Sequence, residues 1–465
     1  MSDTRVRLAA IVAVATFALT ACGDDSEPSA TETGTDAPSE QPSDQASTPE
    51  QAEFACPPEF LPDIPEGLDP ADCWSQPGLE RPVLVDDTVF ALYPDPADPD
   101  APGQVVALDA ETGAQRWMSA VLPGEVAGLH AVDVGGDPGI AVLVTEQDSG
   151  DALTEASESW GYLAWPSEAG DGDDAPAGVE PAEHVTVPKG ENPHIEVYWT
   201  DQGVLAGDFI LKPGATEFTP VNMAPEPMVL GAYDLDESFT GFSGDLLLSY
   251  VRGQAWLPDG PSNGETYVGW LARSADGTEA WNNVVGTPNQ EDTLFGEGPV
   301  QVVIVVGEYL LTITPTDENY TAFELSWLDA ATNTAATPTA ADLEGAEPSV
   351  TATDIMADTT ALLSPDGKHL FASWSTLALI IDVEAGTATR VPTDFAVHGS
   401  AIDDRTFFGS TENGSLTIDL ASGEATAIEA PRQPFDVVDG DFGAAILEGD
   451  IGEPSYLIGG RRTTS

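Results

Sequence analysis

Residues 105–117 have the sequence Val-Val-Ala-Leu-Asp-Ala-Glu-Thr-Gly-Ala-Gln-Arg-Trp, and the order of residue types in this stretch decides the fold. An apolar run ends at Asp109, the pair Thr112-Gly113 closes a turn, and Trp117 follows the glycine by four residues. Short apolar runs bounded by turn residues predict antiparallel β-strands. Glycine accepts the positive φ that a tight hairpin needs. The stretch therefore predicts two strands joined by a tight turn, with the tryptophan on the second strand.

Weaker copies of this unit follow along the chain. Gly277 and Trp281 keep the same spacing, and the turn after Asp329 has Asn333 in the place of the glycine. Asparagine shares with glycine a tolerance of positive φ. We expect the repeated residues to have structural roles. They are Asp109, Thr112, Gly113, Trp117, Gly277, Trp281, Asp329, Asp382, Gly386, Asp419 and Gly423.

The spacing of the copies predicts the architecture. Four markers lie roughly 40–55 residues apart, which is the size of one four-stranded propeller blade. These markers are Arg273, Asp329, Asp382 and Asp419. The chain thus predicts an all-β fold, a seven- or eight-bladed β-propeller over residues 82–465. We expect a strand within Pro82–Val89 to pair with the C-terminal strands and close the ring.

The unit Ala107–Trp117 matches the repeat A-x-D-x-x-T-G-x-x-x-W position for position, and the chain resembles the quinoprotein (PQQ) propeller family over residues 74–465. This resemblance implies that the glycine and the tryptophan dock neighbouring blades, with the indole packed on the backbone of the next blade. The family includes quinone-dependent alcohol dehydrogenases and cofactor-free scaffold lipoproteins, so it leaves catalysis open. The segment Ser364-Pro365-Asp366-Gly367 is similar to a hairpin common in other propellers, which leaves the subfamily open as well.

The first 22 residues are typical of an exported bacterial lipoprotein. Arg5 and Arg7 precede an apolar run over residues 8–19. This run is shorter than the about 20 residues of a membrane-spanning helix, and it has the length of the apolar region of a signal peptide. It ends in Leu-Thr-Ala-Cys, which resembles a lipobox. We expect residues 1–21 to be a cleaved lipoprotein signal peptide and Cys22 to carry the lipid that attaches the mature chain to a membrane.

Two further segments precede the repeats. Residues 22–53 comprise the lipidated N-terminus and an acidic stretch without lysine or arginine. We expect this stretch to be a disordered tether, because its composition buries too little apolar surface to fold. Residues 54–81 form a lead-in that contains Cys56 and Cys73. These two cysteines remain after Cys22, and an oxidising compartment favours a disulfide between them.

The charge and composition of the chain limit its partners and cofactors. It has 80 acidic and 14 basic side chains and a formal net charge of -66. Nucleic acid is therefore excluded as a partner, because its recognition needs a positive field. Three cysteines exclude a multi-cysteine metal cluster, and none of the five histidines lies at a metal-ligand spacing from another. We expect no metal site and no cofactor, and we expect the acidic run 171–174 to be a solvated loop.

No sequence motif assigns catalytic residues. The segment Gly241-Phe242-Ser243-Gly244 is one residue short of a nucleophile elbow and indicates a turn. The quinone enzymes of the family carry adjacent cysteines, and this sequence has no such pair. One or two of the ten tryptophans remain candidates for an aromatic platform that stacks on a ligand.

These observations predict a monomeric, non-catalytic module on the outer face of the cytoplasmic membrane, held there by the lipid on Cys22. It would bind a protein, a peptide or a small ligand, or act as a scaffold. The alternative is a quinone-dependent dehydrogenase of the same fold. A propeller glycosidase or lyase is a third candidate, for which the sequence offers no identifying motif.

Overall fold

The computed structural model divides the chain into residues 1–50 and 51–465, and all residues that it describes lie in the second unit. These are residues 55–57, 60, 64–65, 67–94, 103–148, 157–169, 177–188, 197–200, 203–206, 209–212, 214–221, 233–243, 246–255, 265–283, 285–288, 302–316, 322–352, 359–374, 377–392, 396–428, 434–447 and 455–463. The predicted signal peptide, Cys22, the acidic tether and residues 171–174 lie outside them. Within these ranges, no helix is long and apolar enough to cross a membrane.

The described residues form eight sheets of four or five strands, which we number as blades 1 to 8. Blades 1 to 4 follow one another in the first half of the fold. Blade 1 contains β2 (Glu80–Val85), β3 (Thr88–Tyr93), β4 (Gln104–Asp109), β5 (Gln115–Ser119) and β9 (Ala177–Val179). Blade 2 contains β6 (Gly124–Val134), β7 (Asp137–Asp148), β8 (Ser157–Pro166) and β10 (Glu183–Pro188). Blade 3 contains β11 (Val197–Thr200), β12 (Gly203–Ala206), β13 (Phe209–Leu211) and β14 (Thr219–Pro220). Blade 4 contains β15 (Tyr233–Ser243), β16 (Leu246–Ala255), β17 (Glu265–Ser274), β18 (Glu279–Asn282) and β19 (Val285–Pro288).

Blades 5 to 8 complete the series. Blade 5 contains β20 (Val302–Val306), β21 (Tyr309–Pro315), β22 (Phe323–Asp329), β23 (Thr334–Ala335) and β24 (Pro348–Ala352), with α1 (Ala340–Leu343) before β24. Blade 6 contains β25 (Thr359–Leu363), β26 (His369–Trp374), β27 (Leu377–Asp382) and β28 (Thr387–Arg390). Blade 7 contains β29 (His398–Ile402), β30 (Thr406–Thr411), β31 (Gly414–Asp419) and β32 (Ala425–Ala427). Blade 8 contains β33 (Val437–Asp439), β34 (Phe442–Leu447), β35 (Tyr456–Arg461) and β1 (Trp74–Pro77).

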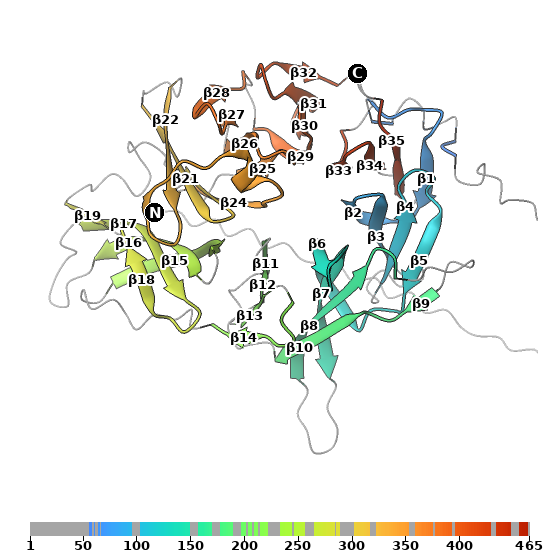
Figure 1. Cartoon of the computed structure of the whole chain (residues 1–465), viewed down its shortest axis with the longest axis horizontal. Coiled ribbons are helices and arrows are strands. Elements are labelled where there is room, and N and C mark those ends of the chain that lie inside the picture. The colour runs from blue at the N-terminus through green and yellow to red at the C-terminus, as the bar shows by residue number, and fades with distance from the viewer. Residues whose placement is uncertain are drawn as a thin grey trace, which may run out of the picture. The chain divides into compact units, whose positions relative to one another are not determined.

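Clusters of buried apolar side chains join the blades into a closed ring. Among the described side chains there are eight clusters, and each combines two neighbouring blades. Val105 and Ile140, for example, belong to the cluster between blades 1 and 2. A cluster that contains Val89 and Leu457 joins blade 8 to blade 1. Figure 1 shows the blades following one another in this order. The fold is therefore an eight-bladed β-propeller, and the higher of the two predicted blade counts is confirmed.

The ring is closed by a strand that precedes blade 1. Strand β1 pairs antiparallel with β35, and Trp74 lies opposite Gly459 (Figure 1). The expectation that Pro82–Val89 supplies this strand is wrong. That stretch contains β2 and the start of β3, which pair with each other inside blade 1. Both segments can form strands, and only the long-range pairing with β35 distinguishes them.

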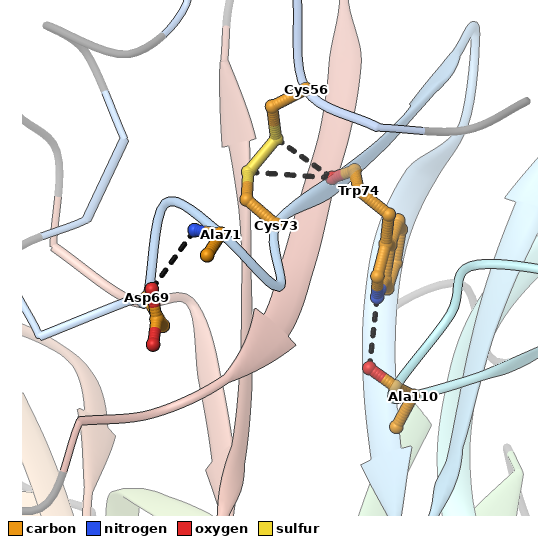
Figure 2. Close-up of a disulfide and its surroundings, with 6 residues drawn as sticks. All are labelled: Cys56, Asp69, Ala71, Cys73, Trp74 and Ala110. Atoms are coloured by element: carbon orange, nitrogen blue, oxygen red, sulfur yellow. Dashed lines mark hydrogen bonds between the residues drawn. A yellow bond between two sulfur atoms is a disulfide. The ribbon is translucent and has the colours of Figure 1, made fainter. Parts of the chain in front are cut away.

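A disulfide fastens the lead-in beside the closing strand. Cys56 and Cys73 are bonded with their Cα atoms 5.5 Å apart, which confirms the predicted pairing. Figure 2 shows the bond next to Trp74, whose carbonyl oxygen lies 3.2 Å from Sγ of Cys56. The buried side chains of Ile64 and Leu68 join the apolar cluster between blades 7 and 8. The lead-in thus helps to hold the two ends of the propeller together.

Two strands depart from the regular order of a blade. Strand β24 follows α1 and adds itself to the free side of β20, where it also contacts β15 and β25. Strand β9 comes from the connection between β8 and β10 and pairs parallel with β5. Blade 5 therefore gains an inner strand, and blade 2 is linked to the outer edge of blade 1.

Candidate functional site

The predicted repeat residues form similar hairpin turns in several blades. In blade 1, Oδ1 of Asp109 accepts hydrogen bonds from the backbone N–H of Thr112 at 2.9 Å and from its hydroxyl at 2.8 Å. The carboxylates of Asp329, Asp382 and Asp419 each accept a bond from the backbone three residues on. Positive φ values occur in these turns at Gly113, Asn333, Gly386 and Gly423, and also at Gly277, where Asp276 accepts the turn bonds. In the structure these residues shape turns.

Three tryptophans connect a blade to the next one. Each indole N–H donates to the carbonyl oxygen of the residue just after the third strand of the following blade. The pairs are Trp74 to Ala110 at 2.8 Å, Trp117 to Ser167 at 2.9 Å and Trp281 to Ala330 at 2.8 Å. Any side chain in place of Gly113 would put its Cβ 2.6 Å from Cδ2 of Trp74, so the close contact requires glycine. Trp74 precedes the repeats, and the sequence motif therefore did not identify its docking role.

The guanidinium of Arg116 connects two turns of blade 1. It lies 2.9 Å from the carboxylates of Asp87 and Asp109, and it donates to the hydroxyl of Thr88 at 2.8 Å. Burial alone would raise the pKa of Asp109, but the hydrogen bonds from Arg116 and Thr112 outweigh burial and lower that pKa. The hydrogen bond from Arg116 also lowers the pKa of Asp87. Both carboxylates are thus held in their charged form.

The three docking tryptophans share one register position on the outer strand, which we call the docking position. In blade 1 the docking residue Trp117 lies opposite Ala107, two residues before the end of β4. The docking tryptophans of blades 4 and 8 have the same register. In blade 2 the residue two before the end of β8 is Ala164, and it lies opposite Glu183. A carboxylate therefore occupies the position at which blade 1 has an indole.

A pocket of about 120 Å³ lies beside Glu183, between blades 2 and 3, and we call it the interblade pocket. Its side-chain walls come from both blades. Blade 2 contributes Asp133, Tyr162 and Glu183, and blade 3 contributes Trp199, Val204, Leu211 and Lys212. Burial and the negative charge of Glu183 raise the pKa of Tyr162 to about 12, so its phenol stays neutral at physiological pH. Aromatic and apolar walls with a few charged groups are typical of small-ligand sites.

Trp199 of β11 is held in the pocket by blade 2. Its ring stacks on His130 of β6 with centroids 5.1 Å apart, and it lies 6.3 Å from the ring of Tyr162. A Cβ added at Gly128 would lie 2.8 Å from the indole nitrogen, so the indole packs directly against β6. The sequence left one or two tryptophans as candidates for an aromatic platform, and no local motif singled out Trp199 among them.

His130 also contacts a distant blade. Its Nε2 lies 2.7 Å from Oε2 of Glu347, the residue immediately before β24. Blades 3 and 4 separate blade 2 from blade 5 along the chain, so the residue before the extra inner strand makes a contact that bypasses both of them. The contact restrains the imidazole on which Trp199 stacks.

A second pocket of about 260 Å³ lies on blade 7. Its walls are polar and consist of Thr406, Thr417, Asp419, Ser422, Glu424 and Thr426. Asp419 and Ser422 already bond to each other within their turn at 2.7 Å. The interblade pocket combines aromatic, apolar and charged walls, and it is therefore the stronger candidate.

The remaining predicted features are placed as follows. His184 pairs with Glu146 at 2.9 Å, and no three His, Cys, Asp or Glu side chains in the described ranges are grouped to hold a metal ion. The sequence indicates a turn at residues 241–244, but residues 241–243 end the long strand β15 and Ser243 is buried, while Gly244 lies outside the described residues.

No protein-family model matches the chain, and neither does any curated protein. Solved structures similar to it include puromycin hydrolase, with 12% identity, a TM-score of 0.35 and coverage of 80% of this chain. The chain spans 56% of the length of that protein. The C-terminal WD40 domain of Sif2 has 9% identity and a TM-score of 0.36, with 77% of this chain and 82% of that chain covered. Hsv2p of Kluyveromyces lactis has 10% identity and a TM-score of 0.32, with 82% and 97% covered.

Proposed function

We propose that this protein is a lipid-anchored, non-catalytic β-propeller that binds a small ligand between blades 2 and 3. The observation that carries the proposal is the interblade pocket. Tyr162, Val204 and Leu211 in its wall are 8%, 1% and 3% exposed, and Glu183 stands at its side. Strands of two sheets thus present two carboxylates and one ammonium among aromatic and apolar groups, which suits recognition of a small molecule.

The predicted location is the outer face of the cytoplasmic membrane. The lipobox-like sequence at residues 19–22 supports attachment through Cys22, and the acidic tether supports display away from the membrane. The disulfide between Cys56 and Cys73 fits an oxidising compartment. The net charge of -66 keeps a displayed protein soluble, disfavours nucleic acid as a partner and favours a monomer through self-repulsion.

A quinone-dependent dehydrogenase of the same fold is the second candidate, and the repeat at Ala107–Trp117 favours it. The interblade pocket does not fit a fused-ring quinone. Its volume of about 120 Å³ has room for only a few non-hydrogen atoms, fewer than a fused-ring quinone contains. We therefore assign no redox step to this pocket.

The proposal is tested with the full chain in a bacterium that processes lipoproteins. Wild type should fractionate with membranes, and Cys22→Ala should accumulate uncleaved or released protein. The purified protein should show a rise in melting temperature with at least one member of a small-molecule panel, because a ligand of the native state stabilises it by mass action. Normal membrane retention of Cys22→Ala contradicts the anchoring. Dye reduction with alcohols or sugars, together with a stabilising shift by quinone and calcium, contradicts the non-catalytic assignment.

A further inference from the structure

We propose that the interblade pocket binds a small organic monocation of the alkylammonium type, held by Glu183 and the faces of Trp199 and Tyr162. This inference rests on the proposed function, and it adds the chemical class of the ligand. It follows from the charge, the aromatic content and the size of the pocket.

The charge of the lining favours a single positive charge. The pocket has the carboxylates of Asp133 and Glu183 and the ammonium of Lys212, which together carry a formal charge of −1. One monovalent cation brings this charge to zero, whereas an anion would make it more negative and a zwitterion would leave it unchanged. Asp133 is exposed and accepts a bond from Gly136 at 2.7 Å, so it contributes its charge to the lining from a turn, whereas Glu183 is half-buried and its charge acts on Tyr162.

The aromatic walls supply the second attraction. Cations bind to the faces of tryptophan and tyrosine rings, and tryptophan is the strongest of them. Trp199 and Tyr162 both line the pocket, with their ring centroids 6.3 Å apart, so both rings are available to a cation that occupies it. The phenol of Tyr162 keeps its proton up to a pH of about 12, so the negative charge of the lining comes from its carboxylates.

The size of the pocket limits the ligand to a few non-hydrogen atoms. Glu183 stands at the docking position, where an indole fills the corresponding junction of blade 1. The floor is formed by Val204 and Leu211, which are nearly inaccessible to water. Methyl or methylene groups next to the charged nitrogen would cover this apolar floor. An alkylammonium therefore fits better than a hydrated metal ion.

The test compares choline with its uncharged isostere 3,3-dimethylbutan-1-ol, and it includes ethanolamine and methylammonium as smaller cations. Titration calorimetry on the mature protein is run at about 0.3 M salt, where the Debye length is about 5–6 Å and the general attraction of an acidic chain for cations is screened. At least one of the cations should bind with a stoichiometry of one. Choline, where it binds, should do so about tenfold more tightly than the isosteric alcohol, which corresponds to about 1.4 kcal/mol.

The variants assign the binding to the pocket. Glu183→Gln should weaken cation binding about tenfold, Trp199→Leu should weaken it by a similar factor, and Glu183→Asp should retain most of it. Glu424→Gln is the matched control, because it removes one exposed carboxylate on blade 7 and should change affinity by less than about twofold. Melting temperatures near that of wild type show that the variants are folded.

Several results would overturn the inference. They are failure of all three cations to bind, equal binding of choline and its neutral isostere, or equal losses in Glu183→Gln and Glu424→Gln. If instead a neutral or anionic compound stabilises wild type but not Glu183→Gln, the alkylammonium class is wrong and the proposed binding function stands. If no compound of any class binds, the proposed binding function is wrong as well.

Discussion

The junction between blades 1 and 2 and the junction between blades 2 and 3 use the same register position in opposite ways. In the first junction, Trp117 is 1% exposed, packs near Phe90 and Trp165, and donates its indole N–H to Ser167. In the second junction, Glu183 takes that position, and the space beside it is the interblade pocket. The comparison shows that the same register position can hold an indole that closes one junction or a carboxylate beside a pocket at the next.

The junction between blades 1 and 2, which Trp117 closes, is expected to contribute more to the free energy of unfolding than the open junction between blades 2 and 3, which contains the interblade pocket. Trp117→Ala should reduce the free energy of unfolding by about 3–5 kcal/mol, because it leaves a cavity between two blades and an unpaired carbonyl at Ser167. Urea unfolding of the mature protein measures this loss. Trp281→Ala is the graded control, since its indole makes the same type of bond but is less buried, and its loss should be smaller.

The opposite outcome would reverse the roles of the two junctions. If Trp117→Ala keeps the unfolding midpoint of wild type but loses ligand binding, the indole belongs to a ligand site. The distinction between a closed and an open junction would then be incorrect.

Removing the disulfide tests how strongly the stability of the propeller depends on the lead-in that precedes blade 1. Replacing both Cys56 and Cys73 by serine should lower the free energy of unfolding by about 3 kcal/mol, because the bond closes a loop with a sequence separation of 17. The same shift should follow reduction of wild type with dithiothreitol, and the double variant should not respond to the reductant. Two titratable thiols in denatured, unreduced wild type would show that the bond does not form in the mature protein.

The parts of the fold that depend on local sequence were predictable. Asp109, Thr112 and Gly113 lie within five residues of one another and make their turn bonds locally, so their spacing predicts the hairpin. Ring closure was not predictable in the same way. Trp74 pairs with Gly459 across nearly the whole chain, and nothing in the local sequence of β1 distinguishes it from β2.

The interblade pocket was less predictable than the fold. It requires Glu183 to stand at the docking position, which becomes visible only when β10 is aligned with Ala164 of β8. It also requires Trp199 from another blade, stacked on His130. A search for the glycine–tryptophan repeat finds only the blades that contain it. A pocket at a junction that lacks the tryptophan leaves no such pattern in the sequence.

Filling the pocket converts the open junction into a closed one. Glu183→Trp should raise the free energy of unfolding by about 1 kcal/mol, because an indole replaces a carboxylate beside buried Tyr162 and Leu211 and fills a cavity. The same change should abolish binding of alkylammonium probes in calorimetry. Glu183→Gln, which keeps the size of the side chain, should lose binding without this gain in stability. A Glu183→Trp protein that binds the probes like wild type would show that the ligand site lies elsewhere.

The smallest expected effect concerns Arg116, the neighbour of Trp117. Replacing Arg116 separates the electrostatic contribution to the stability of the closed junction from the contribution of the indole. Arg116→Gln should lower the free energy of unfolding at pH 7 by about 0.5–1 kcal/mol, because the ion pairs with Asp87 and Asp109 are partly exposed. The folded-state pKa of Asp109 is lowered below the ordinary value of 3.8, so the contribution is present above about pH 4 and is lost as the pH falls through the lowered folded-state pKa. Urea unfolding at pH 7, 5 and 3 should therefore show the difference in unfolding free energy between wild type and Arg116→Gln shrinking at the lowest pH.

A double-mutant cycle measures the coupling between Arg116 and Asp109. Asp109→Asn keeps an oxygen for the turn bonds to Thr112, and its coupling energy to Arg116 should fade over the same pH range. A coupling that is as large at pH 3 as at pH 7 would mean that Arg116 acts through packing beside Trp117 and not through the charges of these carboxylates.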